Sequence, residues 1–186
     1  MRAASGWGGR VVSAVRVLAR YRVALGSVMA LVTVWLARPS ATTLAAGAVV
    51  AGAGGVLRLW AAGHVEKSRE VTSSGPYRYT RHPLYLGSTL IGIGVAVAAG
   101  HLWLGVAIVI YLTSTLTAAM RAEEAHLREK FGAAYDEYAA KRAPASTRAF
   151  SWERARRNRE HHALAGLMAG LSLLALKVWY SHGFVG

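Results

Sequence analysis

Apolar residues gather in five long runs along the chain, and short polar stretches separate these runs. The runs cover residues 21–37, 43–63, 83–100, 102–120 and 163–180. Each has about 17–21 residues, close to the ~20 that an α-helix needs to cross the ~30 Å hydrocarbon core of a bilayer. Because Gly100-His101 alone joins the third run to the fourth, these two predict a tight helical hairpin. The pattern predicts an all-α integral membrane protein with about five transmembrane helices.

The segment before the first run looks amphipathic. Its apolar positions are Val11, Val12, Val15 and Leu18, and its basic positions are Arg10, Arg16 and Arg20. This pattern favours an interfacial helix that leads into an uncleaved first span. The alternative is a secretory signal peptide whose apolar region is residues 23–37.

Basic residues cluster on one side of the predicted spans. Five arginines precede the first span, four Lys or Arg residues lie between the second and third, and ten lie between Arg121 and Arg159. The other side carries Arg38 and Lys177. Since cytoplasmic loops are enriched in Lys and Arg, the pattern predicts a cytoplasmic N-terminus and places all three basic clusters inside.

Beyond residue 121 the fourth helix is expected to continue out of the membrane as a cytoplasmic amphipathic helix. Its apolar face is Leu127, Phe131, Tyr135 and Tyr138, at helical spacing. Such a helix lies on the membrane or caps the bundle. Residues 143–160 are expected to form a basic, loop-like connector. The predicted organisation is therefore residues 1–42 (interfacial helix and first span), 43–142 (core) and 143–186 (connector and fifth span).

Composition narrows the functional classes. The 186 residues are 54% hydrophobic and carry a formal net charge of +13. A basic chain of this size can bind nucleic acid, but here the basic residues flank apolar spans, so anionic lipid explains them better. We expect the lipid bilayer, and no nucleic acid, as a partner. The absence of cysteine excludes disulfides, thiolate metal ligands and a cysteine nucleophile.

The start of the third span concentrates hydrogen-bonding side chains. Pro83 suits the first turn of a helix, whose free backbone N–H groups favour an anion. Arg81 and His82 lie just outside this turn and Tyr85 just inside it. The arrangement suits a ligand that has a carboxylate and a ribose. The alternative is an aromatic and basic belt that anchors the span at the interface.

A second candidate lies at the end of the fourth span. Arg121 and Glu124 are three residues apart on one helical face, and Glu123 lies beside them. Because the third and fourth spans form a hairpin, we expect this end to lie near His82. The alternative is a set of solvated charges just after a span.

Two weaker candidates remain. Gly52 and Gly54 in the second span allow the close approach of either a ligand or another helix, and Arg58 either binds an anion or reaches to the interface. Glu160, His161 and His162 suggest a metal site, but adjacent helical residues do not face one point. We interpret them as a solvated charge run and predict no metal site.

Residues 44–142 resemble the integral membrane methyltransferases related to isoprenylcysteine carboxyl methyltransferase and phosphatidylethanolamine methyltransferase. The matching residues are Gly75-Pro76-Tyr77-Arg78, Arg81-His82-Pro83-Leu84-Tyr85-Leu86-Gly87, Glu123-Glu124, Leu127, Phe131-Gly132, Tyr135 and Tyr138. Gly52-Ala53-Gly54 resembles the Gly-x-Gly element of the phospholipid branch.

The resemblance implies S-adenosylmethionine as the cofactor, held at the cytoplasmic face, and a lipophilic substrate that enters from the bilayer. The residues expected to bind the cofactor are Gly52, Gly54, Arg81, His82, Pro83, Tyr85, Leu86, Gly87, Glu123 and Glu124.

The expected function is transfer of a methyl group to a lipid or prenylated acceptor. Arg121 would anchor a carboxylate acceptor, and Glu124 would take the proton of an amine acceptor. The alternatives are a non-enzymatic membrane scaffold, a lipid-binding protein and a small transporter. We expect a multi-pass protein of the bacterial inner membrane.

Overall fold

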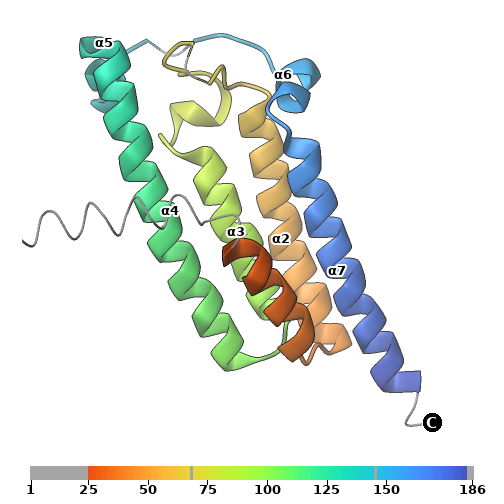
Figure 1. Ribbon diagram of the computed structural model, residues 1–186. Helices are drawn as coiled ribbons and strands as arrows, with labels where there is room; N and C mark the ends of the chain where they lie inside the picture. The colour runs from red at the N-terminus through yellow and green to blue at the C-terminus, as the bar shows by residue number, and fades with distance from the viewer. Residues whose placement is uncertain (1–24, 68, 145, 184–186) are drawn as a thin grey trace, which may run out of the picture.

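The computed structural model describes residues 25–67, 69–144 and 146–183, which form helices and connecting loops without a strand (Figure 1). The helices are Leu25–Leu36, α2 (Ala41–Ala62), the short 3-10 helix η1 (Gly75–Arg78), α3 (Pro83–Ala98), α4 (Leu102–Phe131), α5 (Ala133–Ala139), α6 (Trp152–Arg157) and α7 (Glu160–Gly183). The predicted all-α class is confirmed. The predicted interfacial helix lies outside the described residues.

Three of the helices are long and apolar enough to cross a membrane: α2, α4 and α7. The Leu25–Leu36 helix and the 16-residue α3 are apolar but shorter. At 1.5 Å per residue, α3 is about 24 Å long, less than the hydrocarbon thickness. The structure thus supports an integral membrane protein, while the count of five spans and their orientation stay predictions.

Helices α2 and α3 pack through pairs of glycines. A Cβ on Gly47 would lie 2.4 Å from the carbonyl oxygen of Gly94, and one on Gly54 would lie 2.6 Å from that of Gly87. The two glycines of each helix are seven residues apart and so recur on one face. This is the small-residue packing by which membrane helices approach closely, and it brings the start of α3 against the end of α2.

The far end of α7 is tied to the first described helix. The Nζ of Lys177 donates to the carbonyl oxygens of Val34 and Trp35, at 3.0 and 2.8 Å. These carbonyls belong to the last turn of the Leu25–Leu36 helix, where backbone acceptors lack helical partners.

The predicted hairpin between α3 and α4 is confirmed, with Gly100 at φ +60° in the turn.

The predicted extension of the fourth span is confirmed, since α4 continues without a break past Arg121 to Phe131. The single amphipathic face predicted up to Tyr138 is wrong. Gly132 has φ +51°, a left-handed conformation that glycine adopts without strain, and it ends α4. The chain then turns into α5, which caps this end of the bundle (Figure 1). The turn buries Tyr135, which is 1% exposed.

The connector after α5 is more ordered than the predicted loop-like segment. It contains α6 and is bonded to the loop that follows α2. The Nε of Arg154 donates to the carbonyl oxygen of Gly63 at 2.8 Å, and Arg148 forms a salt bridge with Glu70. Asn158 donates to the carbonyl oxygens of Ala62 and Val65. The connector lies along this loop because its basic side chains meet the free carbonyls and acids there.

His64 lies under this connector and gives the fold a pH dependence. Its ring is 5% exposed, and Nδ1 is 3.1 Å from the hydroxyl of Ser74. Burial, followed by the charges of Arg154 and Arg148, lowers the pKa of His64 below its ordinary value of 6.5. The unfolded chain therefore binds more protons than the folded chain as the pH falls below 6.5.

We expect thermal stability in detergent to fall from about pH 8 to pH 5, with the His64 contribution lost below its unfolded pKa. The variant His64→Gln isolates that contribution, since every other titrating group is retained. Its melting temperature should depend less steeply on pH than that of the wild type. Equal slopes would show that His64 does not titrate on unfolding.

Candidate functional site

The polar end of the bundle brings together four segments that are far apart in the sequence. Figure 1 shows the end of α2, the start of α3, the end of α4 and the start of α7 meeting under α5 and the connector. The alternating directions of the helices cause this convergence, because the single reversal between α3 and α4 returns α4 to the end from which α3 begins. The predicted proximity of the Arg81-His82 turn to the end of α4 is confirmed.

Glu124 is the centre of an ion-pair cluster at this end. Its Oε1 lies 2.9 Å from His82 Nε2 and 3.2 Å from an Arg81 guanidinium nitrogen. Its other oxygen, Oε2, lies 3.5 Å from Arg128, one helical turn further along α4. Pro83 begins α3 and is fully buried, so the position of His82 is fixed by the backbone that leads into the helix. The cluster joins α3 to α4.

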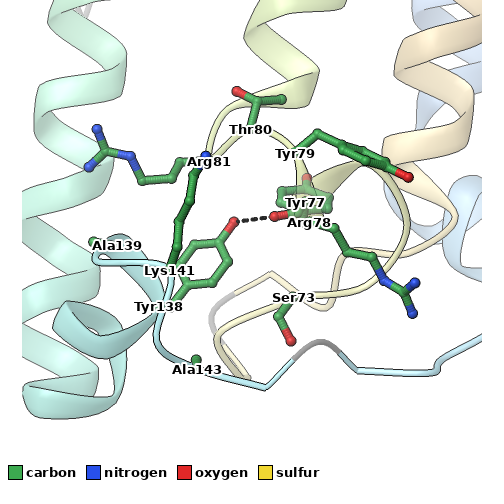
Figure 2. A pocket seen from close by; sticks show the side chains of 10 residues that line it. All are labelled: Ser73, Tyr77, Arg78, Tyr79, Thr80, Arg81, Tyr138, Ala139, Lys141 and Ala143. Carbon is green, nitrogen blue, oxygen red and sulfur yellow. Dashed lines mark hydrogen bonds between the residues drawn. The ribbon is translucent and has the colours of Figure 1, made fainter.

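A cavity of about 390 Å³ opens beside this cluster (Figure 2). Its walls come from η1, the turn before α3 and the end of α5. Figure 2 shows Tyr138 facing Tyr77 across the cavity, with the Tyr138 hydroxyl donating to the Tyr77 carbonyl oxygen at 3.0 Å. Burial raises the pKa of Tyr138 to about 12, so the hydroxyl stays protonated and the bond persists at neutral pH.

A second cavity of about 160 Å³ adjoins the first and shares Tyr77, Arg81 and Tyr138 with it. The loop after α2 forms one wall and the end of α4 with α5 forms the other. Its apolar lining is Val65, Val71 and Leu127, and its polar lining includes Glu66, Glu70, Glu123, His126 and Tyr135. Together the two cavities offer aromatic, apolar and charged surface on the scale of a cofactor site.

A third cavity of about 640 Å³ lies between α2, α3, α4 and α7. Apolar residues of α3 and α4 make much of its wall: Leu84, Leu112, Leu116, Ala119 and Ala122. The rest of its wall is polar or aromatic: Arg58, Lys67, Tyr85, Ser88, Tyr111, Thr115, Glu123 and Glu160. The second and third cavities share two lining residues, Lys67 and Glu123. A cavity at the bundle end therefore adjoins a cavity between the membrane helices, and Glu123 borders both.

Arg58 and Glu160 form a bidentate ion pair in the wall of the third cavity. Arg58 Nε donates to Oε2 of Glu160 at 3.0 Å, and its terminal nitrogen donates to Oε1 at 2.7 Å. Arg58 also donates to the Ser88 hydroxyl on α3. The prediction that Glu160 belongs to a solvated charge run is wrong, since it is 3% exposed. An arginine at this depth needs a counter-charge, and the first turn of α7 supplies it.

The structure gathers part of the predicted cofactor set. Arg81, His82, Glu123 and Glu124 lie in the cluster or the cavity walls, and Tyr85 lines the third cavity. Other members of the set lie elsewhere. Gly54 and Gly87 pack against each other, the space beside Gly52 is open, and Leu86 is exposed. Arg121, which was predicted as an anchor for a carboxylate acceptor, is exposed and lines none of these cavities.

Sequence reasoning missed two residues of the cavity walls. Lys67 borders two cavities, and Glu160 holds Arg58. Lys67 was missed because its sequence context is that of an ordinary basic loop residue. Glu160 was missed because it lies 102 positions from its partner Arg58. One signal for Glu160 was available in the sequence, because the apolar run that follows it contains no other acid. A lone carboxylate at the start of a membrane helix is energetically unfavourable unless it is paired with a basic group.

A sequence model of the phospholipid methyltransferase family matches residues 21–134, more than half of the chain. The chain belongs to this family. No curated protein and no solved structure matches it. Membership makes this chain a membrane enzyme that transfers methyl groups, and it favours this function over the scaffold, lipid-binding and transporter alternatives. The matched region contains Arg58, the Arg81-His82 turn and the Glu123-Glu124 pair, while α6 and α7 lie beyond it.

Proposed function

We propose that this enzyme transfers a methyl group from S-adenosylmethionine to a lipophilic acceptor at the cytoplasmic membrane face. The observation that carries the proposal is the contact of two cavities at Glu123. One lies at the polar end of the bundle, is lined by three tyrosines and suits a nucleoside cofactor, and the other extends between the membrane helices, where a lipid can enter. A transferase needs both reactants at one point, and these cavities share Glu123 and Lys67.

The residues at the polar end fit the methyl donor by their chemistry. Its carboxylate would lie near Arg81 and the first turn of α3, where no side chain caps the start of the helix. The tyrosines Tyr77 and Tyr138 offer flat surface for the nucleoside. Gly52 and Gly54 act through helix packing in this proposal, since α3 already fills the space at Gly54.

The third cavity would hold the acceptor. The family name makes a phospholipid amine the first acceptor to test. Glu124 is already engaged by His82, Arg81 and Arg128. Glu123 borders the acceptor cavity as well, so we assign it, in place of Glu124, the proton of an amine acceptor. A carboxylate acceptor would instead meet Lys67 or Arg58, because Arg121 lines none of the three cavities.

Positioning is the main contribution of the protein to such a reaction. S-adenosylmethionine supplies a methyl group on a sulfonium, which is transferred by in-line displacement. The chain must hold the acceptor atom about 3 Å from that methyl group and keep water away. Tyr85 and the apolar residues of α3 and α4 are placed to exclude water, and Glu123 is placed to hold charge at the junction.

The orientation follows from charge. The polar end carries the basic loops, which the positive-inside rule assigns to the cytoplasm, and the bacterial inner membrane is the location we propose. The cytoplasm is also where a charged nucleoside donor is available without crossing the bilayer.

Binding of S-adenosylhomocysteine tests the donor site. We expect the full-length protein in detergent to bind it in isothermal titration. His82→Ala should weaken binding about tenfold, because a hydrogen bond to a charged group contributes about 1.5–3 kcal/mol and Glu124 would lose one. Glu129→Ala, an exposed acid on the same helix, is the matched control and should bind like the wild type. A folded wild type that fails to bind would refute the donor site.

A further inference from the structure

The Tyr135 hydroxyl is a buried polar group without a hydrogen-bond partner among the described residues. Tyr135 is 1% exposed, and its oxygen is the only buried side-chain polar atom of the described chain that has no partner. Burying a hydroxyl without a bond costs about 1–3 kcal/mol. Proteins satisfy most such groups, so an orphaned hydroxyl needs an explanation.

Tyr135 belongs to the wall of the proposed donor site. Tyr135 lines the 160 Å³ cavity together with Tyr77, Tyr138 and Glu123. Its ring lies 6.1 Å from the ring of Tyr138, and the Arg128 guanidinium lies 5.6 Å from its centroid. The same Arg128 pairs with Glu124, so the ring is fixed by the cluster that orders this end of the bundle.

The protonation state makes the hydroxyl a donor. Burial, followed by the negative charge of Glu124, raises the pKa of Tyr135 above that of an ordinary tyrosine. The proton therefore remains at neutral pH, and the group seeks an acceptor. The hydroxyl of Tyr138 differs in this respect, because it already donates to the carbonyl oxygen of Tyr77.

We propose that the Tyr135 hydroxyl donates a hydrogen bond to an acceptor atom on the nucleoside half of the methyl donor. The inference rests on the proposed function and adds a binding residue to it. The nucleoside half is chosen because three tyrosines and the apolar Val65, Val71 and Leu127 line this cavity, which suits a flat base. The free enzyme would then hold an unsatisfied group that binding satisfies, which favours the bound state.

Tyr135→Phe separates this role from a structural one. We expect the variant to bind S-adenosylhomocysteine about tenfold more weakly, the scale of one hydrogen bond. Its melting temperature without ligand should equal or exceed that of the wild type, because the variant removes an unpaired buried hydroxyl. Tyr180→Phe makes the same chemical change near the far end of α7 and is the matched control, with unchanged affinity expected.

A second ligand locates the contact. 5′-Methylthioadenosine has the nucleoside half and lacks the amino-acid half, so Tyr135→Phe should weaken its binding about tenfold as well. Wild-type affinity of the variant for both ligands would overturn the inference, and so would a loss confined to S-adenosylhomocysteine. A lower melting temperature of the free variant would also overturn it. Failure of the wild type to bind either ligand would refute the proposed function instead.

Discussion

Replacing Glu123 with glutamine is expected to lower kcat/KM for methyl transfer by about 100-fold, the lower end of the contribution of a positioned acid or base. Glu123 borders both cavities and would hold positive charge where they meet. Glutamine keeps the shape of the side chain and removes its charge, so the fold should be unaffected. The initial rate of transfer from a methyl-labelled donor measures the effect.

Glu129→Gln is the control for this change. It removes one acid from the same helix at an exposed position outside the walls of the three cavities. Its rate should match that of the wild type. If Glu123→Gln were equally active, the assignment of Glu123 to the junction would be wrong. If Glu124→Gln were inactive while folded, the role would belong to that neighbour.

The second large effect concerns stability. Arg58→Met is expected to lower the free energy of unfolding by about 3–5 kcal/mol, because it leaves Glu160 as an unpaired charge in a buried position. Chemical unfolding in mixed micelles measures the loss. The double variant Arg58→Met/Glu160→Leu removes both charges and should recover much of it, since apolar replacement of a buried ion pair is often neutral.

A different pattern would contradict the burial of this pair. If Arg58→Met alone were as stable as the wild type, Glu160 would have to reach water in the folded protein. A double variant as unstable as the single one would mean that packing, and not charge, sets the cost. The comparison also tests whether α7, which lies beyond the family match, is energetically part of the core.

Sequence could predict those parts of the molecule that depend on local pattern. Hydropathy gave the positions of α2, α4 and α7, because length and apolar content alone decide whether a helix suits a bilayer. The contact of His82 with Glu124 was predictable despite a separation of 42 positions in the sequence, since a tight hairpin joins their helices. The end of α2 was predictable to one residue from the polar loop that follows Gly63.

Other features depend on tertiary packing and left little local signal. Periodicity predicted one amphipathic face through Tyr138, but the backbone at Gly132 turns the chain and hides Tyr135. The pairing of Arg58 with Glu160 depends on how α7 returns beside α2. The ordered conformation of the connector depends on hydrogen bonds to backbone carbonyl oxygens of the loop after α2. Such bonds cannot be predicted from sequence, because every residue carries a backbone carbonyl. The cavity walls depend on the turn at Gly132, on the return of α7 beside α2 and on the order of the connector.

Methyl transfer itself tests the central proposal most directly. The purified full-length protein would be placed in vesicles of total membrane lipid and incubated with S-adenosylmethionine labelled on its methyl group. We predict that the label appears in the lipid-extractable fraction with the wild type and with Glu129→Gln, and about 100-fold more slowly with Glu123→Gln. A folded wild type that binds the donor but labels no lipid would contradict the proposal.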